Sequence, residues 1–255
     1  MEEHHHPFLS YLPESVETGP ANMAIDMGML RVCAGGGSTF RSYGWQEPTI
    51  TFGLSQRFVD VRSLFAAEAA GLCFVRRPTG GGVVDHRGDW TYALALSADV
   101  GLAQLVPVEI YREIHACVAG VIGDLGGRAV ALAPCPRLCE ERAEPTQAVA
   151  VCFEEPVADD VVLSGGGAKV AGAAMKRTRE GVLIQGSIRP RRVFGDDPGE
   201  GARRDFFNAF AAALAGLLGV GWTIERRGEL CAVTTETAFL QDRECFASEG
   251  WTKRR

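Results

Sequence analysis

The hydrophobic residues of this chain recur with two different spacings, which indicates both helices and strands. In three long segments apolar side chains stand three or four residues apart, as on one face of a helix: residues 20–33, 107–125 and 205–218. Shorter apolar or alternating segments bounded by glycine or proline are typical of strands: residues 39–43, 49–53, 72–76, 91–96, 129–132, 148–153, 160–163, 169–174 and 181–188. Two further helices are expected, at residues 61–71 and from residue 230 onward.

Helices and strands are interspersed along the chain, without an internal repeat and without a linker between them. This order predicts an α/β (α+β) fold in which helices flank a mixed β-sheet. A length of 255 residues is enough for one such domain with a substantial core. We therefore assign residues 20–255 to a single domain and residues 1–19 to an N-terminal arm.

The composition is that of an ordinary globular protein, with 46% hydrophobic and 23% charged residues. The net charge of -6 gives the molecule no general attraction to nucleic acid or to an anionic membrane. The sequence has no apolar run long enough to span a bilayer and no signal peptide, so a cytoplasmic location is expected. The eight cysteines are scattered and are expected to be reduced thiols, and no metal site is predicted.

Candidate chemistry begins with a glycine-rich motif between two predicted strands. Arg76 and Arg77 are followed by Thr79 and by three consecutive glycines, at positions 80 to 82. Glycine lets backbone approach a ligand closely and leaves N–H groups available to bind an anion. A slack hairpin turn next to a solvated arginine pair is the alternative interpretation.

A second candidate is Lys169, which stands between two glycine-rich stretches in an otherwise apolar segment. A lysine in such a place can lie along a ligand groove and contact a phosphate or a carbonyl, or it can protect an edge strand from aggregation. Residues 133–147 combine prolines and charges without a period, and we interpret them as a lid loop.

Four segments together resemble the biotin/lipoate protein ligase and octanoyltransferase superfamily. The motif RRPTGGGVVDH is similar to the Arg-Arg-x-x-Gly-Gly-Gly-x-x-x-His signature of that family, and AKVAGAAMKRTREGVLIQGSI to its Lys-x-x-Gly-x-Ala-x-x-Arg segment. FRSYGWQEPTITFGLSQ and ANMAIDMGML resemble two further family segments. All four occur in the order of the family and span roughly residues 20–190.

The resemblance implies a catalytic domain of this type, without a full C-terminal accessory domain. It implies that Lys169 contacts the acyl carbonyl or an adenylate phosphate. Trp45 and Tyr92 are expected to form walls of an apolar pocket, although a lone tryptophan such as Trp45 is more commonly a core residue. The same resemblance implies that the acyl group or its adenylate is bound by the following residues: Arg76, Arg77, Thr79, Gly80, Gly81, Gly82, His86, Gly172 and Ala173. His86 at a strand edge also has a purely structural interpretation.

Cys152 favours one branch of the superfamily. The stretch VCFEEP resembles the Cys-Phe-x-x-Pro of the octanoyltransferases of Gram-positive bacteria, in which that cysteine is the nucleophile. This resemblance implies transfer of octanoyl from acyl carrier protein, through a Cys152 thioester and without a tightly bound cofactor, to a lysine of a lipoyl domain. The expected lipoyl-domain partners are the glycine cleavage H protein and the acyltransferase subunits of 2-oxoacid dehydrogenases.

Other functions remain open from the sequence alone. Gly82 stands where the octanoyltransferase branch usually has arginine, and Cys152 is also consistent with a buried structural thiol. A lipoate-protein ligase would use ATP and Mg and would proceed through lipoyl-AMP. A non-catalytic lipoate-binding protein would need the apolar groove but neither Lys169 nor Cys152. A biotin-protein ligase fits less well, because such enzymes usually carry a further domain.

Overall fold

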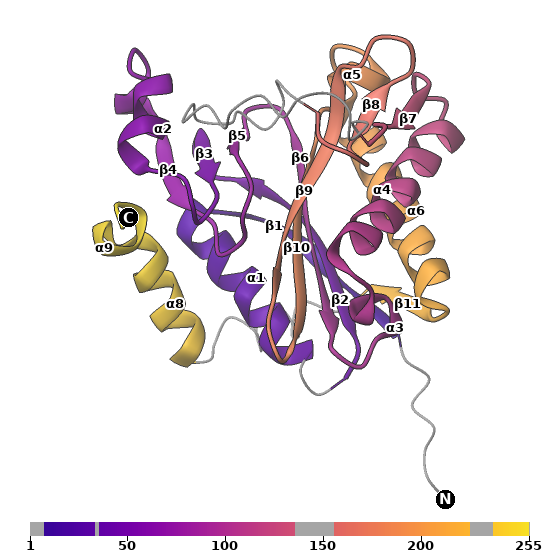
Figure 1. Cartoon of the computed structure of the whole chain (residues 1–255), viewed down its shortest axis with the longest axis horizontal. Coiled ribbons are helices and arrows are strands. Elements are labelled where there is room, and N and C mark those ends of the chain that lie inside the picture. Colours follow the sequence, from indigo (N-terminus) through magenta and orange to yellow (C-terminus); the bar gives the residue numbers. More distant parts are fainter. Residues whose placement is uncertain (1–7, 34–35, 136–155, 225–236, 255) are drawn as a thin grey trace, which may run out of the picture.

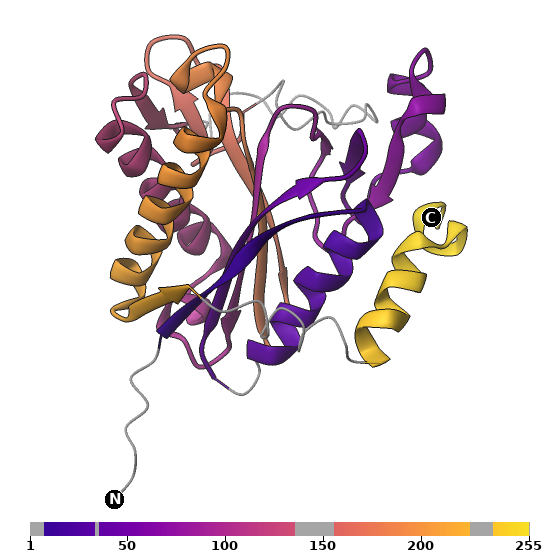
Figure 2. The ribbon, with the colours of Figure 1, turned by 180° about the vertical axis from the view of Figure 1, so that it is seen from behind.

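The computed structural model describes residues 8–33, 36–135, 156–224 and 237–254. Two β-sheets form the centre of the fold, and helices cover both faces of the larger one (Figures 1 and 2). Within the described residues the larger sheet has eight strands in the order β11-β1-β2-β6-β10-β9-β8-β7. They are β1 (Phe8–Glu17), β2 (Ser38–Trp45), β6 (Trp90–Ser97), β7 (Val130–Leu132), β8 (Val161–Leu163), β9 (Lys169–Arg177), β10 (Gly181–Ile188) and β11 (Gly221–Ile224). Parallel and antiparallel pairs both occur, so the mixed sheet predicted from the sequence is confirmed.

The smaller sheet carries the glycine motif. It consists of β4 (Cys73–Arg76), β3 (Thr49–Phe52) and β5 (Val83–Asp85), in that order. The segment Arg77 to Gly82, here called the glycine loop, connects β4 to β5. Because Arg77 N–H donates to the Phe52 carbonyl over 2.8 Å, the start of this loop is fixed to the end of the central strand β3.

The helices form two layers. Helices α4 (Pro107–Asp124) and α6 (Gly199–Leu218) cover one face of the larger sheet, and α1 (Gly19–Cys33) with α8 (Thr237–Ala247) covers the other (Figures 1 and 2). Shorter helices are α2 (Phe58–Leu64), η1 (Ala69–Gly71), α3 (Gly101–Gln104), α5 (Arg191–Phe194) and α9 (Glu249–Thr252). In the described part of the chain, none of the helices combines the length and apolar character needed to cross a membrane.

The alternation of side chains along β6 explains why the two helical layers differ. Trp90, Tyr92 and Leu94 pack into the core beneath α4 and α6. Ala93 and Ala95 point the other way, into the core beneath α1. Successive residues of a strand face opposite sides of the sheet, so large side chains fill one core and small ones let α1 lie close to the other face.

Helix α1 is fixed to the sheet by a buried polar network. Arg41 of β2, which is 1% exposed, donates from Nε to Asp26 Oδ1 over 2.8 Å and from Nη2 to Asn22 Oδ1 over 2.7 Å. Asn22 in turn donates from Nδ2 to the Gly44 carbonyl over 2.9 Å. Burying a charge is costly unless it is paired and hydrogen-bonded, and the pair with Asp26 reduces that cost while these contacts set the position of the helix.

The predicted N-terminal arm at residues 1–19 needs correction, because residues 8–17 form β1. This strand lies in the larger sheet between β11 and β2 and runs parallel to both. Pro13 lies inside it, at a point where the pairing with β2 shifts register between Leu12 and Ser15. Proline interrupts a ladder of backbone hydrogen bonds and is tolerated at such bulges, so the segment does not look like a strand in sequence.

Other boundaries also differ from the sequence-based expectations. The helix predicted at residues 61–71 is α2, which begins at Phe58, followed by the separate turn η1. Strands β5 and β11 were not expected. The predicted strand at 148–153 and residues 136–147 of the predicted lid lie outside the described residues, as does the start of the last predicted helix.

Candidate functional site

A pocket of about 410 Å³ lies between the two sheets. Small or apolar residues make up much of its wall: Met23, Val84, Gly172, Ala173, Ala174 and Gly186. Polar side chains stand among them: Thr51, Arg77, His86, Thr91, Gln185 and Ser187. A mainly apolar hollow with a few convergent polar groups is the usual form of a small-molecule site.

The glycine loop wraps around the side chain of Arg77 and holds it at the pocket. Arg77 Nη2 donates to the carbonyls of Gly80 and Gly82, each over 2.9 Å, and Nη1 donates to Thr51 Oγ1 over 2.7 Å. Gly81 has φ of +88°, and a Cβ there would lie 3.3 Å from Arg77 Nη2. Within the triplet, Gly81 therefore forms pocket wall, whereas Gly80 and Gly82 fix the guanidinium through their carbonyls.

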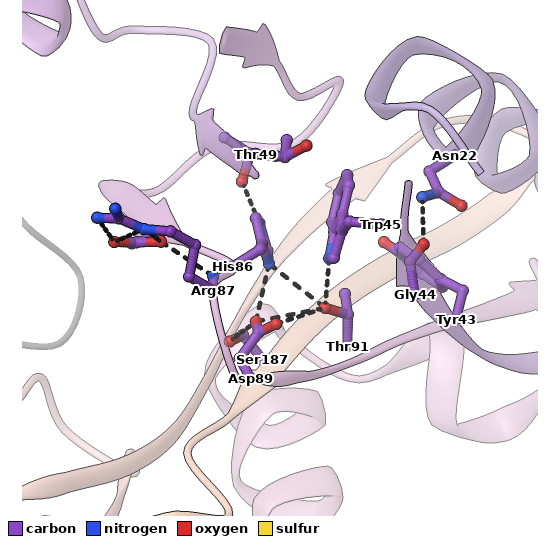
Figure 3. Close-up of polar contacts among 12 residues, drawn as sticks. Asn22, Tyr43, Gly44, Trp45, Thr49, His86, Arg87, Asp89, Thr91 and Ser187 are labelled. Atoms are coloured by element: carbon purple, nitrogen blue, oxygen red, sulfur yellow. Dashed lines mark hydrogen bonds and ion pairs between the residues drawn. The ribbon is translucent and has the colours of Figure 1, made fainter. Parts of the chain in front are cut away.

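His86 continues this chain of hydrogen bonds, and its contacts with Asp89 and Thr91 are drawn in Figure 3. Its Nε2 lies 2.7 Å from Thr51 Oγ1, and its Nδ1 lies 2.8 Å from Asp89 Oδ2. Since Thr51 already accepts a hydrogen bond from Arg77, its own O–H is available to donate to Nε2. The pattern assigns the proton of a neutral His86 to Nδ1, which donates to Asp89. Arg77, Thr51, His86 and Asp89 thus form one connected row.

Trp45 lies against His86 in the pocket wall (Figure 3). The ring centroids of Trp45 and His86 are 4.2 Å apart, with an interplanar angle of 33°. Trp45 Nε1 donates to Thr91 Oγ1 over 2.9 Å, and Thr91 donates onward to Asp89 over 3.2 Å. Ser187 also donates to Asp89, over 2.5 Å. Asp89 therefore orients both rings of this wall, through His86 directly and through Thr91 to Trp45.

Lys169 does not itself line the pocket but lies next to Gly172 of its wall. It is 3% exposed, and its ammonium lies 2.8 Å from Asp160 Oδ2, whose carboxylate is fully buried. A Cβ added at Gly172 would lie 2.5 Å from Lys169 Cε and 2.7 Å from Nζ. Because Gly172 is part of the pocket wall, the lysine ammonium and the glycine loop approach the same cavity.

A second layer of polar groups holds Asp160. The Tyr111 hydroxyl donates to Asp160 Oδ1 over 2.5 Å and accepts from the backbone N–H of Ala173 over 3.2 Å. The ring of His115 packs edge-on against Tyr111 at 4.0 Å, and its Nδ1 donates to the Asp159 carbonyl over 2.7 Å. Burial lowers the pKa of His115 to about 4, so this imidazole is neutral near pH 7 and adds no charge beside the ion pair.

Arg76 does not contribute to the pocket, contrary to the sequence-based expectation. Its guanidinium is fully buried and donates to six backbone carbonyls: those of Gly53, Leu54, Gln56, Trp251, Thr252 and Arg254. The Arg76 carbonyl also accepts from Trp251 Nε1 over 2.8 Å. Arg76 therefore attaches the C-terminal helix α9 to the small sheet. It points away from Arg77 because adjacent residues of an extended chain project to opposite sides.

The prediction that Tyr92 forms a wall of the pocket is also wrong. Its side chain is fully buried on the face of the larger sheet that packs against α6, where it lies 5.1 Å from the ring of Phe210 at 82°. A Cβ at Gly186 would lie 2.2 Å from Tyr92 Cζ. Tyr92 is thus a core residue, which forms no wall of the pocket.

Thr79 acts from behind the pocket wall. Its hydroxyl donates to Gln185 Oε1 over 2.8 Å, and Gln185 Nε2 donates to Asp26 Oδ2 over 2.6 Å. Gln185 is itself part of the wall. Thr79 therefore joins the glycine loop to strand β10 and to helix α1, and does not itself line the cavity.

Several residues of the site were not expected from the sequence: Thr51, Asp89, Asp160, Gln185 and Ser187. Only Asp89 carries a local signal, because it stands three residues after His86 in a tight turn. Asp160 is nine positions before Lys169, and no local period pairs the two. The predicted nucleophile Cys152 lies outside the described residues.

The cysteines of the described part of the chain do not line the pocket. Burial raises the pKa of Cys73 to about 12 and that of Cys117 to about 11, and it also raises the pKa of Cys33. A thiol must ionise to act as a nucleophile, so these raised pKa values disfavour that role for all three.

The sequence profile of the family described as "Lipoyl protein ligase A/B catalytic domain" matches residues 19–189. The chain belongs to this family. The matched span includes both the glycine loop and Lys169, so the family assignment covers the two sides of the pocket.

Individual relatives within this family carry the name octanoyltransferase LipM. The protein of Symbiobacterium thermophilum is 37% identical over 177 residues, a match that covers 67% of this chain and 61% of that protein. The protein of Geobacillus kaustophilus is 35% identical over 170 residues, with 66% and 60% covered. For Kyrpidia tusciae the identity is 32% over 222 residues, with 83% and 80% covered. The chain thus matches about three fifths of the length of the first two relatives.

Solved structures agree with the family fold. A bipartite lipoate protein ligase studied with its E2 lipoyl domain, from Thermoplasma acidophilum, superposes with a TM-score of 0.66 at 17% identity and covers 98% of this chain and 97% of its own. Lipoate-protein ligase A bound with ATP gives a TM-score of 0.65 at 16% identity, with 97% and 98% covered. Identities this low concern the fold, and the predicted ligase-type α/β architecture is confirmed.

Proposed function

We propose that this chain is an octanoyltransferase of protein lipoylation. It would move an octanoyl group from acyl carrier protein to a specific lysine of a lipoyl domain, as in the glycine cleavage H protein or the acyltransferase subunits of 2-oxoacid dehydrogenases. The observation that carries the proposal is the approach of the Lys169 ammonium to Gly172 in the wall of an apolar pocket, opposite the glycine loop. The names of the relatives support the choice of octanoyl transfer over an ATP-dependent ligase.

The pocket suits a medium acyl chain bound next to a fixed positive charge. The small side chains of Gly172, Ala173 and Ala174 leave room for the hydrocarbon along β9. Lys169, held by Asp160 over 2.8 Å, would stabilise the negative charge that develops on the acyl oxygen. An ammonium fixed in advance by a buried carboxylate needs little reorganisation when that charge appears, and this favours the transition state over the bound substrate.

We propose that transfer proceeds in two steps through Cys152. In the first, the Cys152 thiolate attacks the carbonyl carbon of the octanoyl thioester, a new C–S bond forms, and the carrier thiolate leaves and takes up a proton. In the second, the neutral amine of the acceptor lysine attacks the same carbon, an amide C–N bond forms, and the Cys152 thiolate leaves as the amine loses its proton. Both tetrahedral intermediates carry an oxyanion that Lys169 can stabilise.

One assay tests this function against its alternatives. The purified protein is incubated with an apo lipoyl domain and either octanoyl-acyl carrier protein or lipoate with ATP and Mg, and the mass of the lipoyl domain is measured. We expect the octanoyl mass increase with the carrier and no modification with lipoate and ATP. Modification only with ATP would identify a ligase, and failure of both reactions would leave an acyl-binding protein.

A further inference from the structure

A cavity of about 700 Å³ lined by arginines lies next to the proposed acyl site. We call it the arginine cleft, and its wall consists of Arg87, Gly88, Arg189, Arg191 and Arg192. The chain as a whole has a net charge of -6, so four arginines around one hollow form a local positive region on an acidic molecule. A concave basic surface focuses the electrostatic potential and attracts anions.

The arginine cleft is attached to the backbone that begins β9, where Lys169 lies. Arg189 N–H donates to the Val170 carbonyl over 2.8 Å, and Arg192 Nη1 donates to the Lys169 carbonyl. Strand β10 ends at Ile188, directly before the cleft, and contributes Ser187 to the pocket. The cleft and the acyl pocket therefore occupy the same end of β9 and β10.

The arginines of the cleft differ in their surroundings. Arg87 pairs with Asp85 over 2.6 Å and with Glu68. Arg191 is exposed at the first position of α5. The pKa of Arg192 is lowered by burial and by the nearby charge of Arg189. Like charges held this close repel one another, and an anion bound between them would relieve that repulsion.

We propose that the arginine cleft docks the acyl-donor carrier protein through the phosphate of its prosthetic arm and the carboxylates around it. The inference rests on the octanoyltransferase function proposed above, because that function requires a protein to deliver the thioester beside Lys169. Arginine forks match phosphate oxygens in a bidentate manner, and a concave site suits a projecting phosphate.

Charge also indicates that the arginine cleft binds the donor carrier protein and not the acceptor lipoyl domain. The acceptor lipoyl domain presents a lysine, whose ammonium the four arginines would repel. The donor arm carries its phosphate between the carrier and the thioester, so an anion-binding surface near the acyl pocket fits the donor. Complementary charge at the edge of an interface acts mainly on association and specificity.

The test uses two charge-reversing substitutions in the full chain. Arg191→Glu changes the cleft at an exposed position outside the acyl pocket. Arg179→Glu is the matched control, because the Arg179 side chain is 93% exposed in the turn between β9 and β10, at the far end of those strands from α5 (Figure 1). Steady-state kinetics are measured with octanoyl-carrier protein and with apo lipoyl domain as the varied substrates. Octanoyl-pantetheine, which lacks both carrier and phosphate, serves as a second donor.

For Arg191→Glu we expect kcat/KM for octanoyl-carrier protein to fall on the order of tenfold, because KM rises. Added salt should reduce the difference in kcat/KM between the variant and the unsubstituted protein, because it screens the charges. The KM for the lipoyl domain and the rate with octanoyl-pantetheine should match the unsubstituted protein. Arg179→Glu should change none of these values. Thermal unfolding verifies that each variant folds, and Arg191→Ala provides a milder change with a smaller effect of the same sign.

Binding of the carrier protein, measured directly by fluorescence anisotropy, tests the docking site without requiring octanoyl transfer. The inference can therefore be tested separately from the proposed function. Carrier binding that Arg191→Glu weakens supports the cleft even if no octanoyl transfer occurs, in which case the proposed function fails alone. An unchanged carrier KM and unchanged binding in Arg191→Glu would overturn the inference. A raised KM for the lipoyl domain instead would assign the cleft to the acceptor, which also contradicts it.

Discussion

Two neighbouring arginines of this chain serve different purposes, although the sequence presents them as a pair. Arg77 is held by Thr51 and by the carbonyls of the glycine loop, with its guanidinium at the pocket. Arg76 points away from the pocket and binds backbone carbonyls of the C-terminal segment, among them that of Thr252. We therefore expect Arg77 to contribute to ligand binding and Arg76 to stabilise the fold.

Conservative substitution of the two arginines should separate these roles. Arg76→Lys keeps the charge but cannot reach six carbonyls, so the free energy of unfolding in urea should fall by about 3 kcal/mol, while the folded fraction keeps its activity. Arg77→Lys loses the hydrogen bonds to Thr51, Gly80 and Gly82, so it should lower the free energy of unfolding by less than Arg76→Lys does and should also lower kcat/KM about tenfold, because lysine cannot hold the glycine loop in the same way. Equal responses of the two variants in both measurements would contradict this division.

Gly172 gives a second prediction at the level of single residues. In Gly172→Ala the new Cβ would meet Lys169 Cε at 2.5 Å and Nζ at 2.7 Å, so the ammonium must move. Because the end of a lysine side chain is flexible, we expect stability to change little and kcat to fall about a hundredfold as charge stabilisation is lost. Gly166→Ala is the control, since a Cβ there meets nothing within 4 Å, and it should be neutral in both assays. Full activity of Gly172→Ala would exclude a fixed position for Lys169.

Asp160 is expected to act through Lys169 as a positioning residue. Asp160→Asn leaves the lysine ammonium without its carboxylate, so we expect a loss of about 3 kcal/mol of stability and a lower kcat at an unchanged donor KM. In the double variant with Lys169→Ala, activity should equal that of Lys169→Ala alone, because the second change has nothing left to position. A further drop in activity in the double variant would show that Asp160 acts independently.

The sequence located the two sides of the site but not the contacts between them. Glycine and lysine patterns identify the glycine loop and Lys169, because each needs an unusual local composition. The partnership of Lys169 with Asp160 depends on the pairing of β8 with β9, which includes a register shift between Val161 and Val162. No period along one segment encodes such a contact.

At the scale of elements, regular amphipathic segments were predictable and interrupted ones were not. Helix α4 was predicted within one residue of its observed end at Asp124, since its apolar residues keep helical spacing. Strand β1 was missed, because Pro13 and a register shift disturb its alternation. The alternation along β6 predicts a strand, but it does not say which face of that strand lies at the pocket, because this depends on the helices that pack there. The prediction that Tyr92 faces the pocket is therefore wrong, and Tyr92 faces the core beneath α4 and α6.

At the scale of the whole molecule, His115 should make the free energy of unfolding depend on pH. Its pKa is about 4 in the folded protein and about 6.5 in an unfolded chain, so between these values the unfolded chain binds a proton that the folded one does not. The contribution is complete above pH 6.5 and is lost as the pH falls towards 4, by about 3 kcal/mol.

Urea unfolding from pH 7 to pH 4 measures this loss, and His115→Asn is the comparison. Asparagine can still donate to the Asp159 carbonyl, but it does not titrate. The stability of the unsubstituted protein should therefore fall more steeply with acid than that of the variant. Parallel curves would show that His115 does not contribute.

Both sheets contribute residues to the proposed acyl site. The glycine loop of the smaller sheet and Gly172 of the larger one line a single cavity, and the Lys169 ammonium lies next to Gly172. A chemical intermediate should therefore form beside this cavity. The relevant species is the octanoyl thioester of Cys152, which the proposed mechanism requires before the acceptor arrives.

Intact-protein mass spectrometry after mixing with octanoyl-carrier protein alone tests this most directly. We predict a mass increase of one octanoyl group that is removed by hydroxylamine, is missing in Cys152→Ser, and forms at least a hundredfold more slowly in Lys169→Ala. Later addition of apo lipoyl domain should move the group to its lysine. No adduct in the unsubstituted protein, or an adduct formed equally fast without the Lys169 amine, would contradict the account.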